Sequence, residues 1–313
     1  MDEFDTAFRA VIPLFGVTLI GALIRKLNWL TEEADRSLLR VIVNLLLPCL
    51  IFDTALGNPA LGEIRNLIVA PLLGFGTAAL GMLIALGAGA LHGLKERSQQ
   101  RSFALGVGLY NYSYLAVPLA MLLFGKETTG VLFVFNVGVE MCMWTLGVML
   151  LAGGHTGAWR RILNGPMIAI IAAILVNATG LLPHFPDTAH TAVHWLGQCA
   201  IPMALIVIGA IIADYFGEFH PRSGWRVVTA AVLLRMGILP SLFLLLIKVL
   251  PLSPELKRVL IVQAAMPSAV MPIVLSRLYN GDPPTAIRVV IGTSVLGLIT
   301  IPLWLRFGIK LFL

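Results

Sequence analysis

The sequence predicts an all-α integral membrane protein, and three observations lead to this fold class. The chain is strongly apolar: 58% of its 313 residues are hydrophobic, 12% are charged, and the mean hydropathy is +0.91. Soluble domains contain about 25% charged residues, so a soluble chain of this composition could not cover its surface with polar groups. The apolar residues also form long runs, and three pairs of prolines inside those runs share nearly the same offset in sequence.

The apolar runs are long enough to cross a bilayer. A hydrocarbon core of about 30 Å requires roughly 20 apolar residues in a helix. Charged or Pro- and Gly-rich breaks separate the runs, and the connections are too short for a soluble domain. We expect ten transmembrane helices, numbered here as spans 1 to 10, at residues 8–25, 38–56, 67–91, 102–124, 130–152, 166–183, 191–213, 226–250, 258–280 and 286–308.

The basic residues are divided unevenly between the two sides of the membrane. The loops after spans 1, 3, 5, 7 and 9 carry most of the 22 Lys and Arg residues. Cytoplasmic loops are enriched in Lys and Arg, so both termini are predicted to lie outside. The same loops explain the net charge of +6 without a nucleic-acid partner. The acidic N-terminus lacks a basic n-region, so the first run is interpreted as a retained span and not a signal peptide.

Three pairs of prolines indicate an internal duplication. The pairs are Pro13 with Pro166, Pro48 with Pro202, and Pro118 with Pro272, at offsets of 153, 154 and 154 residues. Each pair occupies the same ordinal span of its half. Five spans per half is an odd number, so the second half must enter the membrane from the opposite side. We predict two inverted repeats, at 1–152 and 166–313, joined by a short cytoplasmic link at 153–165, an arrangement that many secondary transporters share.

Spans 4 and 9 are mates in this repeat, and each contains a proline within an apolar run. Proline removes a backbone N–H and collides with the preceding helical turn. Unwound backbone at membrane depth is tolerated only where it is buried in protein or lines a cavity. We therefore expect both helices to break near Pro118 and Pro272 and to cross there. Pro267 has no mate and is interpreted as widening the unwound stretch. The alternative is a pair of kinked packing helices.

Polar residues cluster around these prolines. Half-helix ends offer N–H groups to anions and carbonyl groups to cations. We hypothesise that a substrate binds at the crossing, where Met271 would supply shape and its polar neighbours hydrogen bonds. The candidate binding residues are Asn111, Tyr112, Tyr114, Pro118, Gln263, Ser268, Met271 and Pro272.

Two charged residues lie inside predicted spans. Charges in the membrane interior are costly and are functional hypotheses by default. Glu140 in span 5 and Arg235 in span 8 both reach about the middle of the bilayer, at a rise of about 1.5 Å per residue. We expect them to face each other or a shared cavity. Three roles remain open: a structural ion pair, proton coupling through Glu140, or anion binding by Arg235.

Other polar residues within spans have less specific interpretations. Asp53 lies near the outer end of span 2 and is expected to be hydrated. Asn44 and Gln198 each stand four residues before a proline. They are expected either to hydrogen-bond carbonyls freed by that proline or to line the substrate path.

The sequence gives little support for a metal or cofactor site. The three cysteines lie in apolar runs without CxxC spacing. His190 and His194 are spaced i,i+4, but no carboxylate completes a ligand set with them. The pattern GxxxxGK[ST] is absent, so ATP-driven chemistry is not indicated. We expect no cofactor and no metal, and leave coupling to a proton or to sodium open.

Four stretches resemble the auxin efflux carrier family, which includes plant PIN-type carriers and bacterial organic-acid carriers. They are QAAMPSAVMPIVLSRLYNGDPPTAIRVVIGTSVLGLITIPL (263–303), GLYNYSYLAVPLAMLLFG (108–125), FNVGVEMCMWTLGVML (135–150) and LIRKLNWLTEEADRSLLRVIVNLLLPCLIF (23–52). The resemblance covers nearly the whole chain. The link after span 5 is short, so the chain resembles a compact bacterial-type member.

The resemblance implies ten helices in two inverted halves, with helices 4 and 9 broken and crossed. It also implies a scaffold of helices 1, 2, 6 and 7, a transport unit of helices 3–5 and 8–10, a homodimer and an elevator-like movement. Substrates of the family are typically organic monoanions or dicarboxylates. Asn111, Pro118 and Pro272 carry over as crossover and binding positions. This chain has Ser268 and Met271 where some members have Asn or Gln, so the substrate does not follow from the resemblance.

These observations favour a secondary carrier of a small organic anion in the cytoplasmic membrane of a bacterium. A channel is the alternative, but no ring of repeated carbonyl or carboxylate motifs is present. A membrane enzyme is less favoured, because no nucleophile–base or metal constellation lies within the spans. We therefore expect a transporter and not an enzyme.

Overall fold

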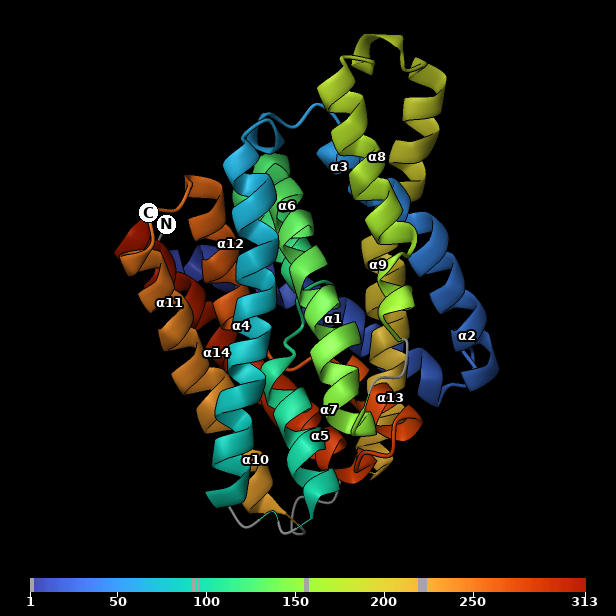
Figure 1. The fold of residues 1–313 in the computed structure, drawn as a ribbon. Helices are drawn as coiled ribbons and strands as arrows, with labels where there is room; N and C mark the ends of the chain where they lie inside the picture. The colour runs from blue at the N-terminus through green and yellow to red at the C-terminus, as the bar shows by residue number, and fades with distance from the viewer. Residues whose placement is uncertain (1–2, 92–93, 95, 155–157, 219–223) are drawn as a thin grey trace.

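The computed structural model describes residues 3–91, 94, 96–154, 158–218 and 224–313, so residues 155–157 of the predicted link lie outside the described part. The regular structure of the described residues is helical (Figure 1), and its one β feature is an isolated antiparallel bridge between Tyr110 and Ser268. The predicted all-α class is confirmed.

The helices are α1 Glu3–Lys26, α2 Glu32–Val41, α3 Leu47–Ala55, α4 Ile64–Leu91, α5 Arg97–Gly108, α6 Ala116–Cys142, α7 Val148–Ala152, α8 Gly165–Thr179, α9 Asp187–Glu218, α10 Trp225–Leu233, α11 Leu239–Val249, α12 Pro254–Ala265, α13 Met271–Leu278 and α14 Pro283–Phe312. Three π-helical turns, Ile42–Leu46, Met143–Gly147 and Leu234–Ile238, join α2 to α3, α6 to α7 and α10 to α11. Single 3₁₀ turns lie at Pro59–Leu61, Ala158–Ile162 and Leu182–His184.

Seven helical stretches among the described residues are long and apolar enough to cross a membrane. Two of the ten predicted spans do not form single helices: span 4 is divided between α5 and α6, and span 9 between α12 and α13. The stretch Ala116–Ala152 joins the end of span 4 to span 5 through a break at Gly125, where φ is 75°. The integral membrane class agrees with the prediction, whereas the count of ten and the inverted repeat stay predictions.

The helices pack in two groups. In one, α1 lies along α9, and α3 contacts α8 and α9; in the other, α4 lies along α5 and α6, and α14 contacts α10 and α12. Small residues allow the closest approaches. A Cβ added to Gly209 would lie 1.9 Å from the carbonyl oxygen of Thr18, and one added to Gly138 would lie 1.8 Å from that of Pro71. Glycine is therefore required at the α1–α9 and α4–α6 contacts.

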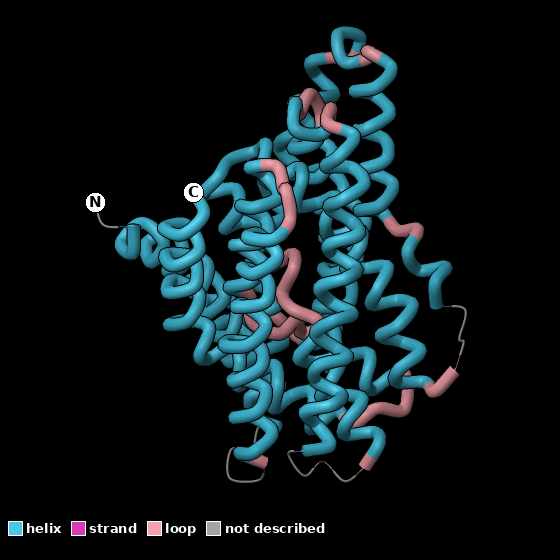
Figure 2. The backbone as a smooth tube through the Cα atoms, turned by 60° about the vertical axis from the view of Figure 1, so that its left-hand side comes forward, coloured by secondary structure: helices cyan, strands magenta, loops and turns pink. Residues whose placement is uncertain are grey.

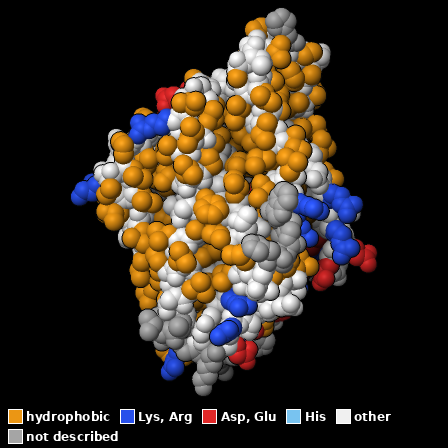
Figure 3. All heavy atoms as spheres, viewed as in Figure 1, with side chains coloured by type: hydrophobic (Ala, Val, Ile, Leu, Met, Phe, Trp, Pro, Cys, Tyr) orange, Lys and Arg blue, Asp and Glu red, His pale blue; other side chains and the backbone are white. Residues whose placement is uncertain are grey.

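The outer surface matches a protein surrounded by lipid. Figure 3 shows hydrophobic side chains over most of one face, with Lys, Arg, Asp and Glu gathered at its edges. Large exposed apolar residues include Leu19 on α1, Leu72 on α4 and Ile299 on α14. The start of α1 and the end of α14 lie on the same side of the bundle in both views (Figures 1 and 2).

Candidate functional site

The two interrupted helices meet in the interior of the bundle. α5 ends at Gly108 and α6 begins at Ala116, while α12 ends at Ala265 and α13 begins at Met271. The unwound segments between them are 109–115 and 266–270. They cross through two backbone hydrogen bonds: the N–H of Asn111 donates to the oxygen of Pro267 at 2.7 Å, and the N–H of Ala269 donates to that of Leu109 at 2.9 Å.

Figure 2 shows loop segments halfway along the bundle, enclosed by helices. The predicted breaks near Pro118 and Pro272 and the contact between the two segments are confirmed. The local cause is the loss of helical donors. A helical N–H at position 267 would bind the carbonyl of Gln263, but Pro267 has none. At the start of α6, the side-chain oxygen of Asn111 accepts from the N–H of Leu115 at 3.2 Å.

A cavity of about 660 Å³ opens beside the crossing. It lies between α2, α3, α8 and α9 on one side and α6 and α13 on the other. Its volume suits a small molecule, since ligand pockets typically occupy about 300–1,000 Å³. Next to the crossing it is lined by Asn111, Tyr112, Ser113, Tyr114, Asn136, Glu140 and Met271.

The predicted binding residues divide into two sets. Asn111, Tyr112, Tyr114 and Met271 line the cavity. Pro118, Gln263, Ser268 and Pro272 are buried, and they are not among the described residues that line it. Of these four, Gln263 bonds to Tyr112 and Ser268 pairs with Tyr110 across the crossing.

Gln263 donates two hydrogen bonds from its side chain. Its Nε2 donates to the carbonyl of Tyr112 at 3.2 Å and to Oδ1 of Asn136 at 3.1 Å. Sequence reasoning missed Asn136, although it stands one helical turn before Glu140 and therefore shares its face. That spacing was the signal available in the sequence.

Glu140 and Arg235 do not meet. Glu140 lines the cavity, and its Oε2 accepts from Nδ2 of Asn164 at 2.7 Å. Arg235 is completely buried, with 0% of its surface exposed. Its Nε donates to the oxygen of Met266 at 2.9 Å, and its Nη2 to that of Gln263 at 3.0 Å. The expectation that the two charges face each other or a shared cavity is wrong, because backbone carbonyls at the end of α12 take the guanidinium.

Aromatic rings complete the surroundings of Arg235. Its Cζ lies 4.7 Å from the ring centroid of Tyr110 and 5.4 Å from that of Phe243. Hydrogen bonds to a charged group contribute about 1.5–3 kcal/mol each, and a desolvated cation–π contact about 2 kcal/mol. A helix C-terminus adds up to about 2 kcal/mol. Together these offset a desolvation cost of several kcal/mol.

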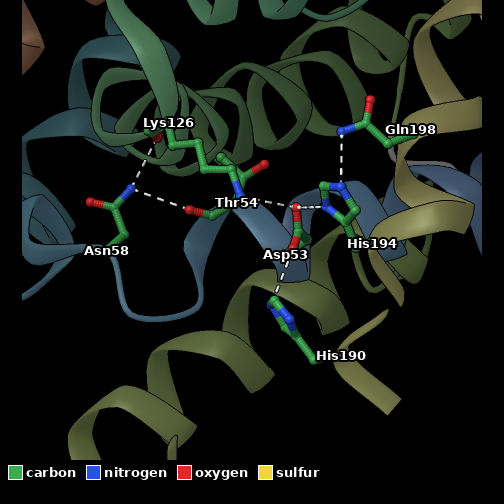
Figure 4. Close-up of polar contacts among 7 residues, drawn as sticks. All are labelled: Asp53, Thr54, Asn58, Lys126, His190, His194 and Gln198. Atoms are coloured by element: carbon green, nitrogen blue, oxygen red, sulfur yellow. Dashed lines mark hydrogen bonds and ion pairs between the residues drawn. The ribbon is translucent and has the colours of Figure 1, made fainter. Parts of the chain in front are cut away.

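A second polar cluster lies around Asp53 (Figure 4). We expected Asp53 to be hydrated, but the structure buries it. Its carboxylate lies 3.3 Å from Nζ of Lys126, 3.3 Å from Nε2 of His190 and 3.1 Å from Nδ1 of His194. The carboxylate that the histidine pair lacked in sequence therefore comes from α3. The structure arranges no group of three or more His, Cys, Asp or Glu among the described residues to hold a metal ion. We call these four residues the Asp53 cluster.

Asn44 and Gln198 lie away from the cavity and are exposed. Nδ2 of Asn44, in the π-helical turn Ile42–Leu46, donates to the carbonyl of Arg40 in α2 at 2.9 Å. Pro48 does not free this carbonyl, so neither alternative for Asn44 is confirmed. Nε2 of Gln198 instead lies 3.5 Å from Nε2 of His194, at the edge of the Asp53 cluster.

Ion pairs lie at the mouth of the cavity, on its rim. Arg25 pairs with Asp35, and its Nε lies 3.1 Å from Oδ2 of Asp214. Nη2 of Arg277 lies 2.7 Å from Oε1 of Glu218. The rim is thus lined by several carboxylates, three of which face a guanidinium.

Comparison with known proteins agrees with this architecture. The model of a family described as membrane transport protein matches residues 6–305. An uncharacterized transporter of Methanothermobacter thermautotrophicus is 25% identical over 96% of this chain and 98% of its own length. The uncharacterized transporter MJ1031 of Methanocaldococcus jannaschii is 23% identical over 94% of this chain and 96% of its own length.

Auxin efflux carrier component 8 of Arabidopsis thaliana is 28% identical over 131 residues, which are 40% of this chain and 35% of that protein. The family match spans nearly the whole chain. It agrees with the structure, which is helical and apolar and has a cavity beside two broken helices. The chain belongs to the membrane transport protein family, the family of the auxin efflux carriers.

Proposed function

We propose that the protein is a secondary carrier of a small organic anion, a carboxylate of the auxin-like or dicarboxylate kind. It would work by elevator-like alternating access. The observation that carries the proposal is the cavity of about 660 Å³ that ends on the crossing of two broken helices. The residues directly before α6 and α13 line this cavity, so two helix N-termini lie next to it. Helix N-termini favour anions.

The substrate carboxylate would be held by neutral donors. Asn111, Tyr112 and Tyr114 line the cavity, whereas the guanidinium of Arg235 binds carbonyls outside it. Each direct hydrogen bond contributes about 0.5–1.5 kcal/mol net, and more when the acceptor is charged. Moderate affinity would suit a carrier, which must also release its substrate.

The position of Glu140 in the cavity supports a proton as the coupling ion. An ionised Glu140 in the same cavity would repel an anion, because like charges in a low-dielectric site are unfavourable. A protonated Glu140 removes the repulsion and can donate a hydrogen bond. We therefore propose that a proton enters with the anion and resides on Glu140.

The moving parts follow the two packing groups. The scaffold would comprise α1, α2, α3, α8 and α9, and the transport unit α4–α7 and α10–α14; the cavity lies between them. A homodimer would form through scaffold helices, with lipid covering the remaining apolar surface. The cavity mouth would lie on the cytoplasmic side of a bacterial inner membrane, with both termini outside, a proposal that the positively charged loops support.

Reconstitution in liposomes tests this function. The purified protein is assayed with radiolabelled indole-3-acetate, benzoate, succinate and malate, with and without imposed proton or sodium gradients. We expect saturable uptake that an inward proton gradient accelerates and that unlabelled substrate inside stimulates. Single-channel currents without such exchange would favour a channel. Stimulation by sodium alone would refute the proton coupling.

A further inference from the structure

Arg235 occupies a distinctive place in the fold. It lies in the π-helical turn Leu234–Ile238 between α10 and α11, and it touches both unwound segments. Its guanidinium stacks on Tyr110 of one segment and donates to the carbonyl of Met266 in the other. Among the described residues, no carboxylate forms an ion pair with its guanidinium. Burying a cation without a carboxylate partner is costly, so the carbonyls and rings around it must compensate its charge.

The carbonyl groups at the end of α12, next to Pro267, provide this compensation. The last carbonyls of a helix have no helical donors, and they carry the negative end of the helix dipole. At the end of α12, Pro267 removes the N–H that would bind the carbonyl of Gln263, and the N–H of Met266 donates to that carbonyl at 3.3 Å instead. Nη2 of Arg235 donates to the same carbonyl at 3.0 Å. Arg235 therefore adds a second, charged donor at the negative end of the helix dipole.

In secondary transporters, the carbonyl ends of broken helices can coordinate a sodium ion. We propose that Arg235 is a fixed cation at the carbonyl end of α12, in the place that a mobile coupling cation would otherwise occupy. The crossing is then electrostatically complete without sodium. Arg235 is a positioning residue: it fixes the unwound segment on which the cavity ends, and it does not touch the substrate.

Further oxygens in the segment make the proposal testable. Oε1 of Gln263 and Oγ of Ser268 are buried and have no hydrogen-bond partner among the described residues. With the carbonyls of Gln263 and Met266 they form a set of oxygens within six residues of chain. Hard cations prefer such ligands. If the guanidinium were removed, a small cation could enter its place.

Thermal unfolding of the purified protein measures this directly. Wild type, Arg235→Ala and Arg235→Lys are compared in chloride salts of sodium, choline and, at millimolar concentration, guanidinium, at equal ionic strength. We expect the Tm of wild type and of Arg235→Lys to be the same in sodium and choline. The Tm of Arg235→Ala should rise by about 2 °C or more in sodium or guanidinium.

Arg258→Ala is the matched control. Arg258 lies in α12, away from the carbonyl end that Arg235 contacts, with its Cζ 5.9 Å from the ring of Phe124. Its removal should create no cation dependence. The proposal is overturned if sodium stabilises wild type, if Arg235→Lys depends on sodium as Arg235→Ala does, or if Arg235→Ala is unaffected by the cation. It is also overturned if Arg235→Ala fails to fold in every salt.

A second measurement uses the proposed function and rests on it. In liposomes, wild-type flux should be equal in sodium and choline, and sodium should restore flux to Arg235→Ala. If no tested carboxylate is transported by wild type, the proposed substrate class fails. The unfolding measurement still decides the role of Arg235, because it requires no substrate.

Discussion

The two ends of the proposed pathway contain the same kinds of charged residue in different surroundings. At the cavity mouth, Arg277 of α13 pairs with Glu218 of α9, and both side chains are about half exposed, at 47% and 51%. At the opposite end, Lys126 of α6 pairs with Asp53 of α3, whose side chain is only 5% exposed. Both pairs join the proposed scaffold to the proposed transport unit.

Burial makes the two ends unequal. Exposed ion pairs contribute about 0–1 kcal/mol, because water and salt screen them. A buried carboxylate that loses its partners leaves an uncompensated charge, which is strongly destabilising. Asn58 adds to the buried end, since its Nδ2 donates to the carbonyls of Lys126 and Glu127 at 3.1 and 3.2 Å. On the proposed mechanism, the Asp53 cluster would hold one end closed, while the pair at the mouth would separate easily.

The largest effect is expected from Asp53→Asn. The change removes the charge that draws Lys126, His190 and His194 together, so the closed end should open more often. We expect a cysteine placed at the buried position Thr54, in a background without native cysteines, to react with a membrane-impermeant maleimide about tenfold faster or more. An unchanged labelling rate would contradict a closing role.

A distinct effect is expected from Glu140→Gln. Glutamine keeps the shape and a donor but cannot carry a proton, so acceleration by an inward proton gradient should disappear while exchange flux persists. Glu218→Gln, a change at the cavity mouth, is the control and should keep the acceleration. Proton-stimulated uptake by Glu140→Gln would place the coupling site elsewhere.

A smaller effect is expected from the histidines of the Asp53 cluster. Nε2 of His190 and Nδ1 of His194 lie 3.3 and 3.1 Å from the Asp53 carboxylate, so their removal takes away two of its three partners. In the double change His190→Gln and His194→Gln, labelling at Thr54→Cys should be faster by a factor of about two to five, less than in Asp53→Asn, because Lys126 still pairs with the carboxylate. A labelling rate equal to that of the parent would show that the histidines do not help to close this end.

The smallest effect is expected from Arg277→Met. Its partner Glu218 is half exposed and can be hydrated when the pair is lost. The free energy of unfolding should change by less than about 1 kcal/mol, and labelling at the opposite end should not change. A loss comparable to that of Asp53→Asn would remove the contrast between the two ends.

Sequence reasoning found the crossing because polar residues accompany its prolines. Pro118 and Pro272 lie in the first turns of α6 and α13, and Pro267 lies in an unwound segment. Prolines inside α1, α4, α9 and α14 leave those helices continuous, so the polar residues beside Pro118, which are typical of unwound backbone at membrane depth, were the distinguishing signal. Four of the eight predicted binding residues line the cavity for this reason. The other four are buried in the helix packing and do not line the cavity. Whether a side chain at the crossing points into the cavity or into the packed helices depends on which helices lie next to it.

The sequence by itself determined the apolar helical class, the positions of the breaks and the family. Only the tertiary structure decided the partners of the charged residues. Arg235 reaches carbonyls 28 and 31 positions away, and Asp53 reaches Lys126 at 73 and His194 at 141. A charge in a sequence requires compensation, but a carboxylate, a helix end or an aromatic ring can each provide it. Which one does so is fixed by helix packing, which proline spacing and hydropathy do not specify.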